Sequence, residues 1–499
     1  MPRLRSALSG SPNVSDIIGD MNRRQFTASL GAVAFARTKK APNVLFIAVD
    51  DLNDWVENFG GNPQSVTPNI VRLGARAIRF QRAYCNAPMC NPSRASLMTG
   101  LRPTTTGVYN NSDTWRDGAP DAVTLPEYFL NHGYRVLGCG KLYHNSQPDY
   151  HAFHEYLPET HPGAEAKAEE SHTPAKAAQG HFDWGPLDIA DEEMEDYRYV
   201  RYTADVLSRK HDQPFFMACG FKKPHLPWYV PRKYFDKFKE SDVKLPPYLA
   251  NDLDDVPKSA ILQGGLRDHA RVTKNDEWQA AIRGYLAAIN FCDTNVGRVL
   301  DALEKGPNAQ DTIIVFWGDH GWQLGEKNMW RKFTLWERSC RAPLMIAAPG
   351  VNKGGADCGR VVEFVDLYPT MLELCGLPPK PGLAGKSLVP LLKDPKRAWD
   401  GTGITSDGAD KISIRTERWR YGRFLDGEEL YNELADPNEW KNLAHHPEAM
   451  TAEQKKVRDT LAARLPKQEN RTKHRAFEQL SPAEKKKLKG NPREGFAKG

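Results

Sequence analysis

Two apolar segments that each end in polar, metal-type side chains most constrain the fold of this chain. Residues 43–49 (NVLFIAV) lead directly into Asp50 and Asp51, and residues 312–318 (TIIVFWG) lead into Asp319 and His320. A continuous apolar run of this length predicts a strand buried on both faces, as in a parallel sheet covered by helices. Ligands gather at the carboxyl ends of such strands, so we expect the four polar side chains at one edge of an α/β sheet.

The chemistry of these side chains predicts a cation site. Adjacent carboxylates such as Asp50 and Asp51 repel each other, and a cation nearby allows both to stay ionised. Three carboxylates favour a hard cation, calcium or magnesium, over zinc, although His320 is an unusual ligand for such an ion. For the first pair, the alternative is that one Asp only caps the helix that follows.

Further candidate site residues follow other predicted strands and one loop. Residues 134–140 and 214–221 have the pattern of buried strands, and the segment after each is rich in lysine and histidine. By default such side chains are solvated, and their position after a strand end is what favours a function. The candidates are Lys141, His144, His225, which lies between Pro224 and Pro227, and Lys332 in the segment 325–333.

The segment CNPSR at residues 90–94 predicts a helix that begins near Cys90 and continues through a run of small and apolar residues. Pro92 is compatible with a first helical turn, where its missing N–H has no consequence. Free backbone N–H groups at the start of that helix, together with Arg94, would form an anion site around the sulfur atom of Cys90. The alternative is that Cys90 is a small buried apolar residue.

Composition excludes several classes of protein. The chain has 499 residues, 40% of them hydrophobic, which is enough for one large and one smaller domain. Its eight cysteines contain no CxxC pair, so neither a zinc ribbon nor a disulfide scaffold is indicated. The net charge of +5 comes from the ends, because residues 41–466 carry 51 basic and 57 acidic side chains. An acidic body does not favour nucleic-acid binding.

The pattern along the chain predicts four regions. Residues 276–303 and 364–377 have helical periodicity, a glycine-rich junction follows at 382–387, and residues 411–425 alternate as in antiparallel strands before a last helix at 453–465. Residues 467–499 carry ten basic and four acidic residues and few apolar ones, which predicts a disordered tail. The regions are a leader (1–40), a large domain (41–395), a C-terminal subdomain (396–466) and the tail (467–499).

The leader resembles a twin-arginine export signal. Arg23 and Arg24 precede a short apolar run, residues 28–36, that is too short to span a bilayer. Since such signals begin near the initiator, we expect Met21 to be the true start; the alternative for the leader is a disordered basic N-terminus. No other segment is long and apolar enough to cross a membrane. We therefore expect export by the twin-arginine translocase to the periplasm or the medium.

The residues Cys90-x-Pro92-Ser93-Arg94, followed by SLMTG at 96–100, resemble the signature of the type I sulfatases of the alkaline-phosphatase-like superfamily. The similarity extends over most of residues 42–445 and includes WGDHG at 317–321. The segments KLYH at 141–144 and KPHLP at 223–227 are most similar to the iduronate-2-sulfatase group, which also shares His320. The resemblance implies a large, mostly parallel sheet sandwiched by helices, with a smaller C-terminal α+β subdomain on an antiparallel sheet.

The resemblance also implies a chemistry. Cys90 would be oxidised to formylglycine, whose hydrate attacks sulfur and leaves the C–O bond of the substrate intact. One calcium ion would be held by Asp50, Asp51, residue 90, Asp319 and His320. Arg94, Lys141 and Lys332 would surround the sulfate oxygens, and His225, with Lys332, would protonate the leaving alcohol. His144 would take a proton from the second hydroxyl of the hydrate so that sulfate is eliminated.

The implied partners are a sulfated carbohydrate as substrate and a formylglycine-generating enzyme during maturation. The expected activity is that of a sulfuric ester hydrolase similar to iduronate-2-sulfatases. Three alternatives stay open: a phosphomonoester or phosphonate hydrolase of the same superfamily, a choline-sulfatase-like activity, and a non-catalytic anion-binding protein in which Cys90 stays a thiol. The phosphatase is disfavoured because no residues can be assigned to a second metal, and the role of Arg331, beside Lys332, stays unassigned.

Overall fold

The computed structural model describes residues 41–499, except 145–148, 161–162, 468, 471–480 and 484–499. The predicted leader and nearly all of the predicted basic tail lie outside the described residues. The body of the chain begins at Pro42.

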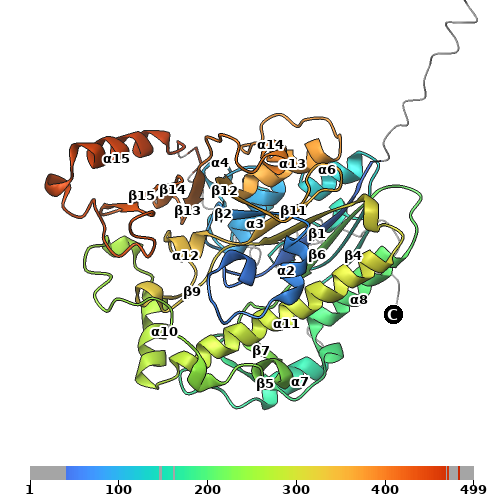
Figure 1. Ribbon diagram of the computed structural model, residues 1–499, viewed down its shortest axis with the longest axis horizontal. Coiled ribbons are helices and arrows are strands. Elements are labelled where there is room, and N and C mark those ends of the chain that lie inside the picture. The colour runs from blue at the N-terminus through green and yellow to red at the C-terminus, as the bar shows by residue number, and fades with distance from the viewer. Residues whose placement is uncertain (1–40, 145–148, 161–162, 468, 471–480, 484–499) are drawn as a thin grey trace, which may run out of the picture. The chain divides into compact units, whose positions relative to one another are not determined.

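A mixed sheet of eight strands forms the centre of this body (Figure 1). Its order is β12-β2-β11-β8-β1-β6-β3-β4, and β11 is antiparallel to both of its neighbours, β2 and β8. The strands in chain order are β1 (Asn43–Val49), β2 (Ile78–Tyr84), β3 (Arg135–Gly140), β4 (Glu155–Leu157), β6 (Phe215–Phe221), β8 (Thr312–Gly318), β11 (Leu344–Ala347) and β12 (Ala356–Glu363). The mostly parallel α/β sheet predicted from the sequence is thus confirmed.

Four adjacent strands, β8, β1, β6 and β3, are parallel to one another. Every residue of β1, β6 and β8 is buried, as expected for strands covered on both faces. Because the four strands run in one direction, the segments that follow them emerge at one edge of the sheet.

Helices cover both faces of the sheet (Figure 1). The long helix α11 (Trp278–Lys305) and α8 (Glu195–Ser208) pack on one face, and α3 (Cys90–Thr99), α6 (Leu125–Asn131) and α13 (Leu367–Leu374) lie on the other. The remaining α-helices are α2 (Pro68–Gly74), α4 (Pro103–Thr106), α5 (Trp115–Gly118), α7 (Gly163–Ser171), α9 (Arg232–Phe235), α10 (Gln263–Lys274), α12 (Glu337–Cys340) and α14 (Val389–Lys393). None of the described helices is long and apolar enough to cross a membrane.

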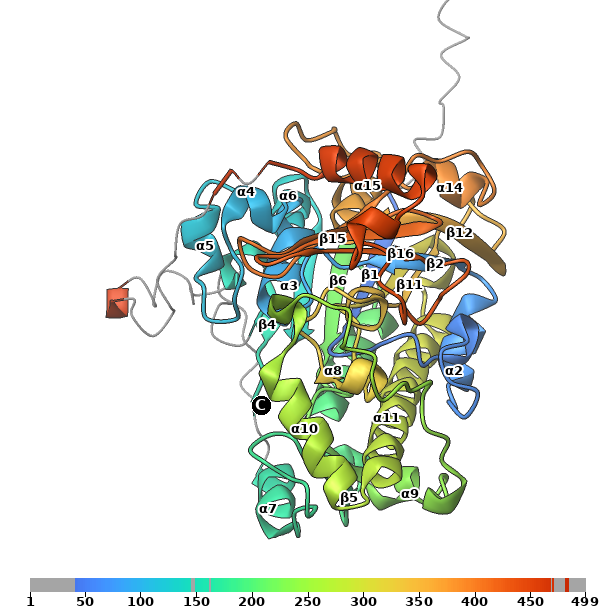
Figure 2. The same cartoon turned by 90° about the vertical axis from the view of Figure 1, so that its left-hand side faces the viewer.

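A second, antiparallel sheet follows near the C-terminus, with α15 (Ala452–Arg464) packed against it (Figure 2). Its strands, in order, are β13 (Gly403–Ser406), β14 (Ile412–Arg415), β15 (Trp419–Arg423) and β16 (Glu428–Asn432). Two short pairs, β5 (Trp184–Leu187) with β7 (Trp228–Pro231) and β9 (Gln323–Leu324) with β10 (Trp330–Arg331), complete the strands. The predicted small antiparallel sheet and its helix are confirmed, whereas the boundary at residues 395 and 396 stays a prediction.

Buried ion pairs join the small sheet to the main body. The carboxylate of Glu337, at the start of α12, accepts hydrogen bonds from Tyr84 Oη (2.9 Å), Arg415 Nε (3.2 Å) and Arg420 Nη2. Arg420 Nη1 also donates to the carbonyl oxygen of Leu335 (3.0 Å). The small sheet therefore holds the segment that follows Lys332.

Candidate active site

The parallel strands bring the sequence candidates to one edge of the sheet. Asp50 and Asp51 follow β1, Asp319 and His320 follow the neighbouring β8, Lys141 follows β3, and the segment with His225 follows β6. Candidates that are up to 270 residues apart in the chain, from Asp50 to His320, thus come together because the strand ends share one edge.

Helix α3 brings the cysteine to the same edge. It begins at Cys90, every one of its residues is buried, and it ends at Thr99, followed by the capping residue Gly100, whose φ of 71° suits glycine. The N–H groups of Asn91 and Ser93 donate to Asn111 Oδ1 (3.0 Å) and to the carbonyl oxygen of Met89 (3.1 Å). The predicted anion site made of free N–H groups is therefore wrong for these two donors, because both are already bonded.

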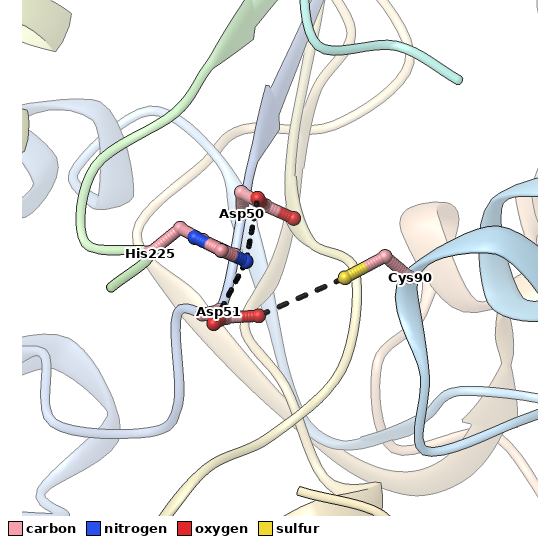
Figure 3. A group of neighbouring side chains, drawn as sticks. All are labelled: Asp50, Asp51, Cys90 and His225. Carbon is pink, nitrogen blue, oxygen red and sulfur yellow. Dashed lines mark hydrogen bonds and ion pairs between the residues drawn. The ribbon is translucent and has the colours of Figure 1, made fainter. Parts of the chain in front are cut away.

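The Cys90 sulfur lies among the candidate metal ligands (Figure 3). Its Sγ is 3.4 Å from His320 Nε2 and 3.9 Å from Asp51 Oδ1. One potential ligand atom each from Asp50, Asp51, Cys90 and His225 lie within 4.8 Å of one another, and the same holds for Cys90, Asp319 and His320. The two groups share Cys90 and so describe one centre.

Asp51 has a strained backbone and an unsatisfied side chain. Its φ is 57°, a region that non-glycine residues seldom adopt, and this conformation is held by Tyr285 Oη, which donates to the Asp51 carbonyl oxygen (2.8 Å). The Asp51 N–H donates to Asp319 Oδ1 (3.0 Å). The Oδ2 atom of Asp51 is buried and has no hydrogen-bond partner among the described residues. An unpartnered buried carboxylate oxygen favours a cation as its partner.

Arg94 fixes two of the carboxylates. Its guanidinium is fully buried and donates through Nε to Asp319 Oδ2 (2.9 Å), through Nη2 to Asp50 Oδ1 (3.0 Å), and through Nη1 to the carbonyl oxygen of Lys141. This planar fork orients acceptors that come from three different strand ends. The predicted contact of Arg94 with a sulfate oxygen stays a prediction.

Two buried lysines add positive charge on the side of the cysteine. Lys141 Nζ is paired with Asp50 Oδ2, and Lys332 Nζ is paired with Asp51 Oδ1. Lys332 Nζ also donates to Cys90 Sγ (3.1 Å). The centre thus combines carboxylates with ammonium groups close to the sulfur atom.

Burial and these charges set the protonation of the centre. Burial raises the pKa of Asp51 to about 6 and that of Asp319 to about 7, in spite of the nearby lysine and arginine. For Asp50, burial acts in the same direction, but the charges of Lys141 and Arg94 outweigh it and hold its pKa well below the ordinary value. Burial also raises the pKa of the Cys90 thiol, and Lys332 offsets this only in part.

Two candidate histidines remain, and His225 lies beside the carboxylates. His225 Nε2 is 3.8 Å from Asp51 Oδ2 and 4.0 Å from Asp50 Oδ2, while its Nδ1 lies 2.6 Å from the carbonyl oxygen of Leu226. Burial and the charge of Lys141 lower the pKa of His144 to about 3, and its buried Nδ1 has no partner among the described residues. Both rings are therefore neutral at neutral pH in this arrangement, since the pKa of His225 is also lowered by burial and by Lys141.

A comparison with protein families decides the identity. The family described as sulfatase matches residues 42–377 of this chain. The chain belongs to the type I sulfatase family. A second match, to the family described as N-sulphoglucosamine sulphohydrolase, C-terminal, covers residues 325–470 of the sulfatase. Members of this family, within the alkaline-phosphatase-like superfamily, are sulfuric ester hydrolases that generally depend on formylglycine and a metal ion.

Individual relatives agree with this assignment. The sulfatase is 39% identical to a "Sulfatase" of Formosa agariphila, over 81% of this chain and 83% of that protein. It is 30% identical to the iduronate 2-sulfatase of Mus musculus, over 68% of this chain and 70% of that protein. It is also 30% identical to the choline-sulfatase of Rhizobium meliloti, over 82% of this chain and 84% of that protein.

Solved structures confirm the fold. The phosphonate monoester hydrolase of Agrobacterium radiobacter superposes with a TM-score of 0.71 at 21% identity, covering 85% of the sulfatase and 94% of that chain. A structure described as a 2-O GAG sulfatase gives a TM-score of 0.66 at 22% identity, covering 88% and 100%. At these identities the similarity concerns the architecture alone.

The structure adds residues that the sequence did not single out. Tyr285 had the spacing of a core residue in a helix, yet its hydroxyl group supports the Asp51 backbone. Ser93 lies inside the CNPSR segment, and its hydroxyl donates to the Asp319 carbonyl oxygen (2.5 Å). For Ser93 the motif itself was the available signal, whereas nothing in the sequence distinguished Tyr285 from its apolar neighbours.

Proposed function

We propose that this sulfatase removes sulfate from a sulfated sugar by means of a formylglycine formed from Cys90 and one bound calcium ion. The observation that carries the proposal is the convergence of Asp50, Asp51, Asp319 and His320 around the Cys90 side chain. These residues come from three distant segments, and burying so many polar groups together is unfavourable unless they act on a common ligand.

The donor atoms fit a calcium ion. Asp50, Asp51 and Asp319 supply carboxylate oxygens, which are the ligands that hard cations prefer, and Asp51 Oδ2 lacks a hydrogen-bond partner among the described residues. His320 Nε2 lies 3.3 Å from Asp51 Oδ1 and 3.6 Å from Asp319 Oδ1, so it faces the same centre. These four residues and residue 90 would hold the ion, which would supply positive charge at the reacting oxygen atoms.

Residue 90 fits a modified side chain better than a free thiol nucleophile. Reactive thiols have a lowered pKa, whereas burial raises the pKa of Cys90. A formylglycine at this position supplies, as its hydrate, an oxygen nucleophile for attack on sulfur. The start of α3 and Lys332 Nζ would keep that side chain directed at the metal centre.

The cationic side chains have two different tasks in this proposal. Lys141 and Lys332 provide ammonium groups that stabilise negative charge on the sulfate oxygens as the ester bond breaks. Arg94 keeps Asp50 and Asp319 in place, because its hydrogen bonds go to these carboxylates and to a backbone oxygen, and its contact with a sulfate oxygen remains part of the proposal. Prearranged charge of this kind needs no reorganisation during the reaction.

The histidines serve proton transfer. A carbonyl oxygen can only accept, so His225 Nδ1 carries a hydrogen atom toward Leu226, and Nε2 is left facing the carboxylates. In the neutral ring Nε2 carries no proton, so we assign to it a proton taken up from solvent when the negatively charged sulfate ester binds, which favours the imidazolium form, and then delivered to the leaving alcohol. His144, whose Nδ1 is buried without a partner among the described residues, takes up a proton when sulfate is released.

A sulfated uronic acid sugar is the substrate that we favour. Support comes from the similarity to iduronate 2-sulfatase and from the segments KLYH and KPHLP, which contain His144 and His225. The similarity to a choline-sulfatase, which extends over a larger share of the chain, favours choline sulfate as the second candidate. Rates of sulfate release from iduronate 2-sulfate disaccharides, other sulfated sugars and choline sulfate would rank them. The proposal requires that an iduronate or related uronate sulfate give the highest kcat/KM.

The reaction class is tested with matched aryl esters. We expect 4-nitrophenyl sulfate to be hydrolysed with a much higher kcat/KM than 4-nitrophenyl phosphate. Cys90→Ala abolishes the sulfatase activity in this proposal, whereas Cys375→Ala, which alters an equally reduced and buried cysteine, retains it. A preference for the phosphate ester would overturn the proposal and favour the phosphoesterase alternative.

We also propose that the chain is exported by the twin-arginine translocase and matured by a formylglycine-generating enzyme. The support is the sequence of residues 21–40, which lie outside the described residues. Mass spectrometry of the mature protein should find its N-terminus after the apolar run, and native peptides from residues 1–20 would contradict a start at Met21.

A further inference from the structure

The carboxylate of Asp196 is buried without a cation partner. Asp196 lies in the first turn of α8 and is 2% exposed. It makes no ion pair in the part of the chain that the structure describes. Its two oxygen atoms accept instead from two successive backbone N–H groups, Lys222 (2.8 Å, Oδ1) and Lys223 (3.0 Å, Oδ2). Burying a carboxylate without a cation is unfavourable, so its two hydrogen bonds to backbone N–H groups indicate a specific role for Asp196.

The two N–H groups begin the segment that carries His225. This segment, residues 222–228, starts directly after β6 and is held by a small set of internal hydrogen bonds. The His225 N–H donates to the Lys222 carbonyl oxygen (2.9 Å), Lys223 Nζ to that of Pro227 (2.6 Å), and Trp228 Nε1 to that of Pro224 (2.8 Å). The segment is thus a compact unit whose first two residues are fixed by Asp196.

We propose that Asp196 is a positioning residue for His225 and sets the place of its Nε2 atom relative to the leaving oxygen. The inference rests on the proposed function, in which His225 protonates the leaving alcohol. His225 lies two residues beyond the second N–H that Asp196 holds, and its Nε2 is 3.8 Å from Asp51 Oδ2. A proton donor must reach its acceptor within hydrogen-bond distance, so a small displacement of this segment reduces proton transfer.

Only a carboxylate suits this position. Two N–H donors need two acceptors, and the amide of an asparagine offers one acceptor and one NH₂ group. In Asp196→Asn the side-chain NH₂ group therefore faces one of the two backbone N–H groups, so the hydrogen bond to either Lys222 or Lys223 is lost. The volume of the side chain is unchanged. The variant disturbs the His225 segment without touching Asp50, Asp51, Asp319 or Cys90.

The experiment measures kcat for a series of aryl sulfates that runs from 4-nitrophenyl sulfate, a good leaving group, to unsubstituted phenyl sulfate. Good leaving groups need little protonation, so loss of the proton donor steepens the dependence of kcat on leaving-group pKa. We expect Asp196→Asn to lose less than about twofold with 4-nitrophenyl sulfate and about tenfold or more with phenyl sulfate, a part of the 10²–10⁴-fold that such catalysis supplies. His225→Asn should give a still steeper dependence.

Asp293→Asn is the matched control. Asp293 is 1% exposed and also accepts from two successive backbone N–H groups, Asn69 (3.3 Å) and Ile70 (2.8 Å), but these start α2 and not the His225 segment. It should change kcat by the same factor for every ester. Asp196→Glu keeps both acceptor oxygens but displaces them by one methylene, so it should steepen the dependence of kcat on leaving-group pKa less than Asp196→Asn does. It provides the measurement if Asp196→Asn does not fold.

The results distinguish a failure of the inference about Asp196 from a failure of the proposed function of His225. Suppose that kcat depends steeply on leaving-group pKa in His225→Asn but as in wild type in the Asp196 variants. That result overturns the inference and leaves the proposed function intact. A uniform loss across all esters in the Asp196 variants, as in Asp293→Asn, also overturns it. A wild-type dependence in His225→Asn removes the assigned proton donor, and with it both the role of His225 and the inference.

Discussion

Replacing Asp51 by asparagine should stabilise the metal-free enzyme. Burial raises the pKa of Asp51 to about 6 from an ordinary value of 3.8, and Asp50 adds to this effect while Lys332 opposes it. Since each pKa unit corresponds to 1.36 kcal/mol, ionised Asp51 lowers the free energy of unfolding by about 3 kcal/mol at pH 7. The asparagine side chain carries no charge, so we expect D51N to gain up to about 3 kcal/mol in the presence of a chelator.

The pH dependence of this gain has a defined sign. The loss of stability caused by Asp51 begins near pH 4, where its carboxyl group ionises in the unfolded chain. It is complete above pH 6, where the same group also ionises in the folded chain. The difference between D51N and wild type should therefore be small at pH 4 and reach its full size near pH 7. Urea unfolding followed by tryptophan fluorescence at several pH values measures it.

Calcium should reverse the order of stability. A ligand that binds only the folded state adds about 4 kcal/mol when present at about 1,000 times its Kd, and D51N lacks one of the ligand side chains. The control is Asp54→Asn, because Arg338 and Arg341 outweigh its burial and hold the pKa of Asp54 below the ordinary value, so D54N should be destabilised with or without calcium. The reasoning is refuted if D51N is less stable than wild type in chelator, or if calcium stabilises both proteins equally.

Three further predictions follow from particular contacts. Arg94→Lys keeps the charge, but its single ammonium nitrogen cannot reach the three acceptors that the guanidinium fork spans, so it should lower the free energy of unfolding by about 3 kcal/mol or more and weaken calcium binding measured by calorimetry. Lys332→Met should reduce kcat for aryl sulfates about 10²–10³-fold, as expected for the loss of one charge-stabilising group, and a loss below tenfold would argue against its role. Glu337→Gln should cost about 3 kcal/mol at pH 7 in urea unfolding, since Arg415 and Arg420 each lose one carboxylate partner and keep Glu433. Because these arginines outweigh burial and hold the pKa of Glu337 below its ordinary value, that difference should shrink as the pH falls below about 4, and a constant difference would contradict it.

Much of the fold was predictable because buried parallel strands leave a clear pattern. The segments before Asp50 and Asp319 are uninterrupted apolar runs, and the structure confirms them as β1 and β8 with the same bounds as the runs. The strands before Lys141 and His225 and the long helix α11 were also recovered, since their periodicity is strong. The antiparallel strand β11 was not predicted, because a run of four apolar residues does not indicate whether a strand is parallel or antiparallel to its neighbours.

The sequence predicted which residues form the site but not the hydrogen bonds between them. Strand ends indicated that Asp50 and Asp319 would meet, because parallel strands bring their carboxyl ends to one edge. That Arg94 bonds to both carboxylates depends on how α3 packs on the sheet, which no local pattern specifies. Tyr285 and Asp196 act through hydrogen bonds to backbone groups far away in the sequence, and such contacts leave no periodic signal.

The central claim is that residue 90 acts as a formylglycine within the metal centre. Tryptic mass spectrometry of the peptide that contains residue 90, from enzyme that hydrolyses an aryl sulfate, tests it most directly. The account predicts a peptide about 18 Da lighter than the one with cysteine, in an amount that follows the specific activity of each preparation. Fully active enzyme with an intact thiol at Cys90 would contradict it.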